Sequence, residues 1–351
     1  MSGFDRFPEQ HEAKRLLEAA LADGPSHAYL LHGPRGVGKR ELARAFGRAL
    51  LGTTRHVHPD LYELDALGEM IRIDAVRNLR RDLHMRPFEA DRRVYLILSA
   101  DQLNEDAADA LLKDLEEPPP YAVIVLVADD LGPIPETIRS RCQLVPFRRL
   151  SERAMREAVA ARAPHLDDER RSALARVAAG RVDRLERLLD AESAERREVL
   201  LEQARAVYGR AGFEPEAAAA ALLEGARRRG AQAKELEEVK VQGLELPARE
   251  AEQQIRRAQR GAEREELLAQ LEELASWYRD LVVVAVGAEA AAVHVDRLDD
   301  LRADASRERV LGAERAAAAV RETWRKLEEF NLAPQLALEA LFVQLARELP
   351  A

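Results

Sequence analysis

The chain is 351 residues long, which is enough for two or three domains with buried cores. Charged residues make up 33% of it and aromatic residues 5%, a composition that favours helices. With 54 basic and 63 acidic residues, the net charge of −9 excludes a protein whose whole surface coats DNA. The single cysteine, Cys142, excludes an internal disulfide. The polar N-terminus and the short apolar runs predict a cytoplasmic protein without a secretory signal or membrane contact.

The first predicted elements surround a glycine-rich segment. Residues 28–31 (AYLL) form a short apolar run, and residues 40–51 are rich in helix formers. Between them, GPRGVGK at 33–39 fits the phosphate-binding loop pattern G-x-x-x-x-G-K, whose amides and lysine hold the phosphates of a nucleotide. Strand, loop and helix in this order are the context that such a loop requires. The candidate phosphate-binding residues are Gly33, Gly36, Gly38 and Lys39.

One position of this loop departs from the pattern. The residue after the lysine is normally Ser or Thr, whose hydroxyl binds the Mg²⁺ that accompanies the nucleotide. Here that residue is Arg40, and a guanidinium cannot ligate a cation. Two interpretations of Arg40 remain open. Its charge offsets the phosphates in place of the metal, or its side chain fills the metal position of a loop that is kept as a scaffold.

Two further strands are predicted on the C-terminal side of the loop. Residues 94–98 and 123–127 are continuously apolar and rich in β-branched side chains, as expected for parallel strands that are buried on both faces. Residues 105–117 between them predict a helix that is capped by Asn104. These elements predict an α/β domain with a parallel sheet over residues 1–149.

Strand signals stop near residue 150, and the rest of the chain is predicted to be helical. Short amphipathic helices predict a small helical domain over 150–205, and longer helices predict a second one over 206–351. Within the latter, the segment 225–247 is charged and contains glycines. The sequence leaves its structure open between a solvated hairpin and a partly disordered insert.

Several motifs occur in the order and spacing of one protein family. They are HAYLLHGPRGVGK at 27–39, HPDL at 58–61, ALLKDLEEPPP at 110–120, IRSRC at 138–142, WYRDLVVVAVG at 277–287 and NLAPQLALEALFVQL at 331–345. In these motifs the chain resembles the clamp-loader AAA+ family of bacterial DNA polymerase III subunits, of the delta-prime type, with gamma/tau as the near alternative. The resemblance implies a P-loop AAA+ module, a small helical lid and an all-α collar domain used for oligomerisation.

The resemblance also locates the residues that ATP hydrolysis requires in this family. The strand at 94–98 should end in Asp-Glu, one carboxylate for Mg²⁺ and one to orient the attacking water. The spacing from ALLKDLEEPPP places that pair at Leu98-Ser99 or one residue later, and neither pair contains a carboxylate. The residue that senses the γ-phosphate falls at or near Ala128. With Arg40, these changes predict no intrinsic ATPase activity and no required cofactor, and they leave ATP or ADP binding open.

One functional residue of the family is retained. The arginine of the SRC motif is Arg141, between Ser140 and Cys142. In the family this arginine projects into the ATP site of a neighbouring subunit, where it stabilises charge in the transition state. The resemblance therefore implies that Arg141 is the catalytic residue of this chain, acting in trans. Cys142 is interpreted as a buried small apolar residue, and Arg184 is a candidate for the family's sensor-2 arginine.

The resemblance also bears on metals and partners. Many relatives carry a four-cysteine zinc module before HPDL; here that insertion is reduced to residues 52–55, and His56 and His58 have no cysteine beside them. We therefore expect no zinc and no other metal site. The expected function is that of a non-hydrolysing clamp-loader subunit in the DNA-directed DNA polymerase complex. Its expected partners are gamma/tau and delta subunits and, through the complex, the sliding clamp and primer-template DNA. An active gamma/tau-like ATPase and an AAA+ scaffold outside replication are the alternatives.

Overall fold

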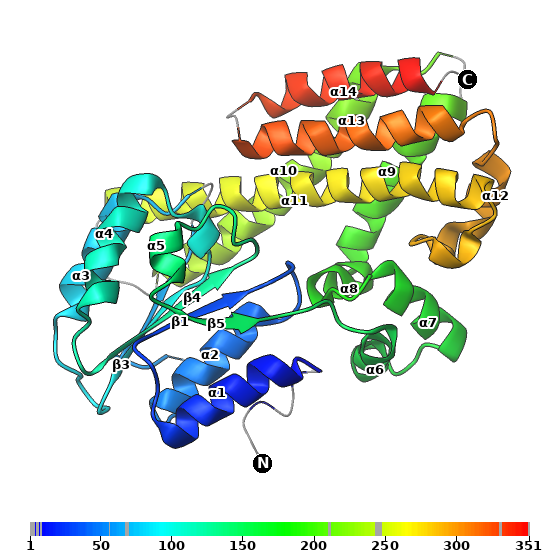
Figure 1. The fold of residues 1–351 in the computed structure, drawn as a ribbon. Coiled ribbons are helices and arrows are strands. Elements are labelled where there is room, and N and C mark those ends of the chain that lie inside the picture. The colour runs from blue at the N-terminus through cyan, green and yellow to red at the C-terminus, as the bar shows by residue number, and fades with distance from the viewer. Residues whose placement is uncertain are drawn as a thin grey trace. The chain divides into compact units, whose positions relative to one another are not determined.

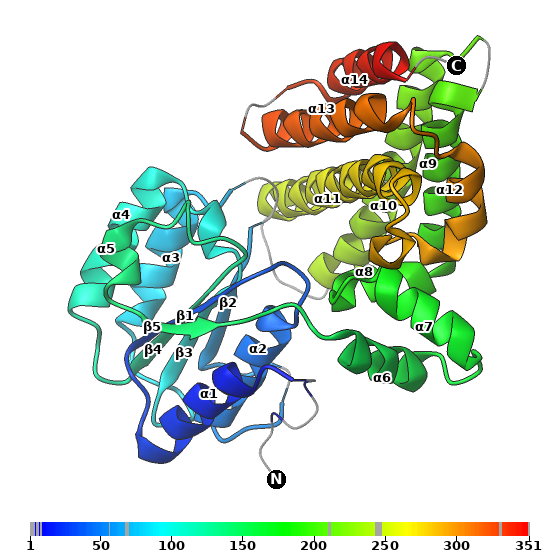
Figure 2. The same cartoon turned by 45° about the vertical axis from the view of Figure 1, so that its right-hand side comes forward.

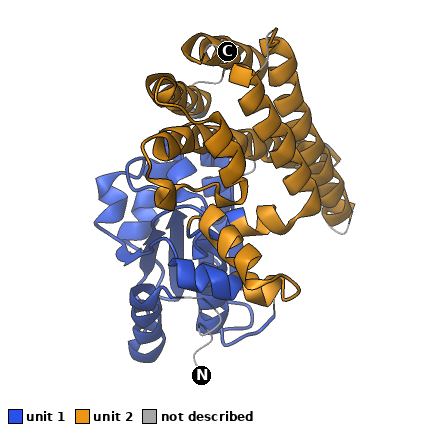
Figure 3. Ribbon diagram, turned by 90° about the vertical axis from the view of Figure 1, so that its right-hand side faces the viewer, with its two compact units in different colours: residues 1–158, 180–184 blue, residues 159–179, 185–351 orange. Residues whose placement is uncertain are grey.

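The computed structural model describes residues 4, 7, 9–55, 57–66, 70–209, 212–242, 248–329 and 332–349. The chain divides into two compact units, shown in Figure 3. Unit 1 contains residues 1–158 and 180–184, and unit 2 contains residues 159–179 and 185–351. This division does not test the domain boundaries expected after residues 149 and 205, which stay predictions.

A parallel sheet forms the centre of unit 1 (Figure 1). Its five strands within the described residues are β1 Ala28–His32, β2 Leu61–Leu64, β3 Arg93–Ile97, β4 Ala122–Ala128 and β5 Gln143–Pro146. They pair in the order β2-β3-β4-β1-β5, and every pairing is parallel. The inner strands β3, β4 and β1 are almost completely buried, as their continuously apolar sequences indicate. The predicted α/β fold of this part is confirmed.

Helices cover both faces of the sheet. They are α1 His11–Asp23, α2 Lys39–Leu50, α3 Ile73–Leu83, α4 Glu105–Glu116 and α5 Glu136–Arg139, with a short 3-10 turn η1 at Ala100–Gln102. On one face, α1 and α2 share a buried apolar cluster with the sheet that includes Phe46 and Val125. The helices α3, α4 and α5 lie on the other face (Figure 2). They share a cluster with the sheet that includes Leu111 and Ile124. Asn104 caps α4 as predicted, because its Oδ1 accepts a hydrogen bond from the N–H of residue 107.

The carboxylate of Asp60, in HPDL, organises the turn that precedes β3. It is buried and accepts hydrogen bonds from the N–H groups of residues 88–90 at 2.7, 2.8 and 2.9 Å. The buried guanidinium of Arg93 lies 3.7 Å from it and pairs with Asp82 at 2.7 Å. Burial alone would raise the pKa of Asp60, but the three backbone hydrogen bonds and Arg93 hold it below its usual value. The family motif therefore has a structural role here.

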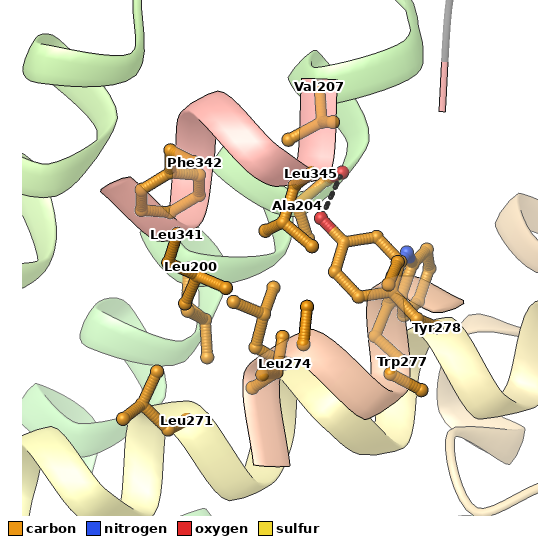
Figure 4. Close-up of a cluster of buried hydrophobic side chains, with 14 of the residues drawn as sticks. Leu200, Ala204, Val207, Leu271, Leu274, Trp277, Tyr278, Leu341, Phe342 and Leu345 are labelled. Atoms are coloured by element: carbon orange, nitrogen blue, oxygen red, sulfur yellow. Dashed lines mark hydrogen bonds between the residues drawn. The ribbon is translucent and has the colours of Figure 1, made fainter. Parts of the chain in front are cut away.

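After residue 150 the described elements are helical, as predicted. They are α6 Glu152–Arg162, α7 Asp168–Val177, α8 Val182–Leu189, α9 Ala191–Gly209, α10 Pro215–Gln242, α11 Ala248–Ala285, η2 Glu289–Ala291, η3 Val295–Arg297, α12 Leu298–Asp304, α13 Val310–Glu329 and α14 Pro334–Glu348. A buried apolar cluster joins α9, α10, α11, α13 and α14 (Figure 4). In it, Trp277 and Tyr278 are completely buried, and their polar atoms donate hydrogen bonds to the Tyr208 hydroxyl and the Ala204 carbonyl.

The segment left open by the sequence is mostly helix. Residues 225–242 continue α10 without a break, so they form neither a separate hairpin nor a disordered insert, and residues 243–247 lie outside the described part of the chain. Packing against α11 explains why Gly225 and Gly230 occur within this helix. A Cβ on Gly230 would lie 2.3 Å from Cγ of Glu263, and one on Gly225 would lie 3.0 Å from Nε2 of Gln270. Glycine therefore lets α10 and α11 approach closely.

A buried histidine lies between two carboxylates in unit 2. Nδ1 of His294 is 2.8 Å from Oδ2 of Asp280, and Nε2 is 3.1 Å from Oε1 of Glu273. Arg197 also donates to Glu273, at 2.6 Å. Burial alone would lower the pKa of His294, but its hydrogen bonds to the two carboxylates and their charges raise it above the ordinary value. The folded state therefore favours the protonated imidazole.

We predict that Asp60→Ala lowers the free energy of unfolding by about 3–5 kcal/mol. The substitution leaves three N–H groups without their acceptor and removes one of the two carboxylates beside the buried guanidinium of Arg93, which keeps Asp82. Chemical denaturation of the full chain measures this loss. Asp74→Ala is the control, because that side chain is 85% exposed, and we expect its effect to stay within about 0.5 kcal/mol. A similar small effect for Asp60→Ala would contradict the structural role of HPDL.

We predict that the stabilisation by His294 depends on pH. Because its pKa is higher in the folded state, the contribution is fully present below the unfolded-state pKa of about 6.5 and is lost as pH rises through the folded-state pKa. His294→Gln should therefore destabilise the chain more near pH 6 than near pH 9, as measured by denaturation midpoints across that range. An equal loss at both ends would show that the charge of His294 contributes nothing.

Candidate functional site

The glycine-rich segment forms a loop between the end of β1 and the start of α2. Gly33, Gly36 and Gly38 have φ angles of 138°, 74° and 92°, which favour glycine over other residues. A Cβ on Gly33 would also lie 2.3 Å from the carbonyl oxygen of Phe147. The predicted strand, loop and helix are confirmed. Gly38 precedes the first residue of α2, Lys39, so the loop amides lie at a helix N-terminus.

The side chain of Lys39 is held inside the loop by the chain itself. It is 3% exposed, and its Nζ donates to the carbonyl oxygens of Gly33 and Pro34 at 2.6 Å each. The same Nζ pairs with Oδ1 of Asp129 at 2.8 Å. Burial lowers the pKa of Lys39, and the charge of Asp129 opposes that shift. The cation that would meet a nucleotide's phosphates therefore already has a carboxylate partner.

Arg40 bridges Asp65 and Ser99, of which Ser99 lies at the expected position of the acidic pair. Its Nη1 pairs with Oδ2 of Asp65 at 2.8 Å, and its Nη2 donates to Oγ of Ser99 at 2.6 Å. The Ser99 hydroxyl in turn donates to Oδ1 of Asp65 at 2.6 Å. The guanidinium, hydroxyl and carboxylate thus form a closed ring of contacts, which supports the interpretation that Arg40 fills the metal position.

These residues do not fit Mg²⁺. The cation requires oxygen ligands in near-octahedral geometry, usually including one or two carboxylates. Arg40 brings a positive charge to the position of the usual hydroxyl, and Ser99 stands at the expected acidic pair. The one carboxylate in this ring, Asp65, is engaged by Arg40 and Ser99.

Two acidic side chains lie near the sensing position at the end of β4, Asp129 and Asp101. Ala128 is buried at 1% exposure and offers no polar group. Asp129, the next residue, pairs with Lys39, and its N–H donates to Oδ2 of Asp101 at 3.3 Å. Burial and the charge of Asp129 raise the pKa of Asp101. The loop therefore faces negative charge at a place where ATP would bring more.

A third carboxylate lies against the loop from the segment 180–184. The N–H of Val182 donates to the Gly36 carbonyl at 2.7 Å, and a Cβ on Gly36 would lie only 1.7 Å from Oδ1 of Asp183. Asp183 pairs with Arg181 at 2.8 Å and lies 3.9 Å from Nε of Arg35. Burial alone would raise the pKa of Asp183, but the hydrogen bond and charge of Arg181 hold it below its usual value. Asp183 is therefore ionised against Gly36.

Arg184, the candidate for the sensor-2 arginine, is the residue after Asp183. The N–H of Arg184 donates to Oδ1 of Asp183 at 2.8 Å. The side chain that packs directly against Gly36 is that of Asp183. The sensor-2 role of Arg184 stays a prediction.

Arg141 follows α5 and lies outside this cluster. Its Nη1 donates to the Thr137 carbonyl at 2.8 Å, and its Nη2 pairs with Oε1 of Glu116 at 2.5 Å. The Ser140 hydroxyl donates to the same carbonyl at 3.2 Å. Cys142, expected to be buried, is only half-buried and packs against the apolar cluster beneath α3, α4 and α5. Its burial raises the pKa of the thiol to about 12, so the side chain is protonated near neutral pH and is a poor nucleophile.

The topology separates Arg141 from the loop of its own chain. β5 runs parallel to β1, with Tyr29 opposite Gln143 and His32 opposite Pro146. Arg141 precedes β5, whereas the loop follows β1, so the two lie at opposite ends of these strands. Four strand residues at about 3.3 Å each put about 13 Å between them. The structure brings Gly33, Gly36, Gly38, Lys39 and Arg40 together and leaves Arg141 apart.

Three important side chains were missed by sequence reasoning. Asp65 directly follows β2 and Asp129 directly follows β4. Acidic residues just after parallel strands gather at one edge of a sheet, so this pattern could have identified both. Asp183 had no comparable signal, because an acidic residue at the start of a helix is common.

The described residues show neither a metal cluster nor a membrane span. In these parts of the chain, no group of three or more His, Cys, Asp and Glu side chains is placed to hold a metal ion. His56 lies outside the described residues, and Nδ1 of His58 accepts a hydrogen bond from the N–H of Asp60 at 3.1 Å. Across the described helices, none combines the length and apolar character needed to cross a bilayer.

A family model and several known proteins match part of the chain. Residues 9–151 match the family model described as "DNA polymerase III, delta subunit". The chain is 34% identical over 164 residues to the tau subunit of DNA polymerase III from Bacillus subtilis, covering 42% of this chain and 29% of that protein. It is 32% identical over 160 residues to the delta' subunit of the same organism, covering 41% and 49%. A delta' subunit from Pseudomonas aeruginosa is 35% identical over 136 residues, covering 33% and 42%.

Among solved structures, a DNA polymerase III gamma subunit-related protein from Thermotoga maritima aligns with 96% of this chain and 99% of its own length. Its TM-score is 0.49 and its identity 18%. The matched region spans less than half the length of each curated relative. These relatives support membership of the clamp-loader AAA+ family and include both delta' and tau subunits.

We predict that removing the carboxylates beside the loop creates anion affinity. The double variant Asp129→Asn, Asp183→Asn should bind ADP about tenfold more tightly than the wild-type chain in the absence of Mg²⁺, because two negative charges near the phosphates are lost. Calorimetric or fluorescence titration measures the change. Asp130→Asn is the matched control, because this exposed carboxylate adjoins Asp129 and accepts a hydrogen bond from the N–H of Gly132 in its own turn. Equal affinities in all three proteins would contradict the electrostatic argument.

Proposed function

We propose that this clamp-loader AAA+ family member is a non-hydrolysing subunit of the DNA polymerase III clamp loader, of the delta-prime type. In this proposal it assembles with gamma/tau and delta subunits through its C-terminal helices. It helps to load the sliding clamp onto primer-template DNA, and it supplies Arg141 to the ATP site of a neighbouring subunit. It requires no nucleotide, zinc or other cofactor of its own.

The proposal rests mainly on the phosphate-binding loop, whose cationic side chains lie beside carboxylates of the same chain. Lys39 pairs with Asp129, Arg40 with Asp65, and Arg35 lies beside Asp183. Binding ATP would place additional negative charge among these carboxylates or require them to move away. Hydrolysis would further need a metal and a carboxylate to orient water, and the positions of both are held by Arg40 and Ser99.

The position of Arg141 supports a role in trans. Its side chain is 34% exposed and lies about 13 Å along the strands from the loop of its own chain. It cannot act on phosphates held there. An exposed guanidinium next to a short helix and an edge strand is available to a second AAA+ subunit, where an arginine contributes a rate factor on the order of 10³ or more.

An active ATPase of the gamma/tau type is the nearest alternative, since the matched relatives include tau subunits. The matched relatives include both types, so sequence similarity does not separate the two. The chemistry of the loop favours the non-hydrolysing role, because three independent positions lack the groups that hydrolysis uses: Arg40, Ser99 and Ala128. An AAA+ scaffold outside replication is supported by no specific observation.

We predict that the purified chain turns over no ATP in Mg²⁺, and that Arg141→Ala impairs a loader reconstituted from this chain and its partner subunits. The loss should be on the order of 10³-fold at the one ATP site that Arg141 serves, with little change in KM, because the arginine acts in the transition state. Steady-state ATP turnover measures both. Arg153→Ala, which removes an exposed helical ion pair, is the control. Turnover by the chain alone, or an unimpaired Arg141→Ala loader, would contradict the proposal.

A further inference from the structure

The guanidinium of Arg141 is held between the C-terminal end of α4 and the short helix α5. Glu116 is the last residue of α4, and its carboxylate pairs with Nη2 of Arg141. Thr137 belongs to α5, and its carbonyl accepts from Nη1. α4 and α5 also pack against each other. One nitrogen is thus held by each helix, which fixes the plane of the guanidinium as well as its position.

The location of Glu116 is unfavourable for a carboxylate on its own. The C-terminal end of a helix carries partial negative charge, so an acidic side chain in the last turn is destabilising unless a cation lies beside it. Arg141 supplies that cation. The helix end and Glu116 together attract the guanidinium, so the pair is stabilised from both sides.

The pair is nevertheless solvent-accessible. The side chains of Arg141 and Glu116 are 34% and 47% exposed. Water screens an ion pair of this kind, so it orients the arginine without binding it strongly. A long side chain that is already oriented loses less conformational freedom when it meets a ligand.

We infer that Glu116 is a positioning residue for Arg141, which orients the guanidinium for the triphosphate held by a neighbouring subunit. The inference rests on the proposed function, because it assumes that Arg141 acts in trans. Glu116 does not touch the nucleotide. It contributes by holding Arg141 in the geometry that the transition state requires. Each terminal nitrogen of a guanidinium carries two N–H groups, so one on each remains after the contacts with Thr137 and Glu116.

The test uses a loader reconstituted with Glu116→Ala, Glu116→Gln, Arg141→Ala or both alanine substitutions. We expect Glu116→Ala to lower kcat at the served site about fivefold, equivalent to about 1 kcal/mol, with KM for ATP unchanged. Glu116→Gln keeps a hydrogen-bond acceptor for Nη2 and should recover most of that loss. In the double variant, the loss should be no greater than that of Arg141→Ala alone, because Glu116 acts only through Arg141.

Glu117→Ala is the matched control, because this exposed neighbour donates its backbone N–H to Lys113 at the same helix end. We expect it to behave as wild type. If Glu116→Ala leaves kcat unchanged or raises it while Arg141→Ala is impaired, the positioning role is wrong and the proposed function stands. If Arg141→Ala is unimpaired, the proposed function itself fails. An increased kcat would show that Glu116 masks the charge of Arg141 instead of orienting it.

Discussion

The ion pair of Lys39 and Asp129 is the interaction on which the candidate site depends. An ammonium group that is 3% exposed needs a counter-charge, because burying an unpaired charge costs several kcal/mol. In a nucleotide-binding loop the phosphates can supply it. Here the sheet supplies it, because His32 at the end of β1 lies opposite Ala128 at the end of β4. The residues that follow these strands, the loop and Asp129, are therefore neighbours.

Other groups of the loop also have their partners within the same chain. Arg40 is neutralised by Asp65 after β2, and the Gly36 backbone is contacted by Val182 and Asp183. The segment that carries Asp183 also accepts a hydrogen bond from the N–H of Leu150 at the Gly180 carbonyl. The loop therefore helps to hold the segment 180–184 against the sheet. The carboxylates of Asp65, Asp129 and Asp183 neutralise or contact the loop where the phosphates of a nucleotide would otherwise do so. The proposed catalytic residue, Arg141, precedes β5 and is therefore distant from the loop.

Much of the fold could be predicted because its signals are local. Continuous apolar runs indicated β1, β3 and β4, and Asn104 indicated the start of α4. The loop was recognisable from its spacing, and so was the loss of a metal-binding hydroxyl at Arg40. These features depend on a few consecutive residues and on the periodicity of apolar side chains.

The partners of those residues depend on contacts between distant parts of the sequence, for which Asp65 gave an indirect signal by directly following β2 and Asp183 gave none. Asp65 and Asp183 lie 25 and 143 positions after Arg40, and only the folded sheet and the 180–184 segment bring them to the loop. The continuous helix through 225–242 was also missed. Its glycines look like interruptions in the sequence, whereas packing of α10 against α11 requires their small size. Tertiary packing decided each of these points.

The most direct measurement of the central claim is a calorimetric titration of the full chain with ATP in the presence and absence of Mg²⁺. We predict no Mg²⁺-dependent binding up to about 1 mM ATP, because the metal position is filled by Arg40 and the loop cations are already paired. Saturable one-to-one binding that requires Mg²⁺ and is tighter than about 10 µM would contradict the claim that the chain's own carboxylates have replaced the nucleotide.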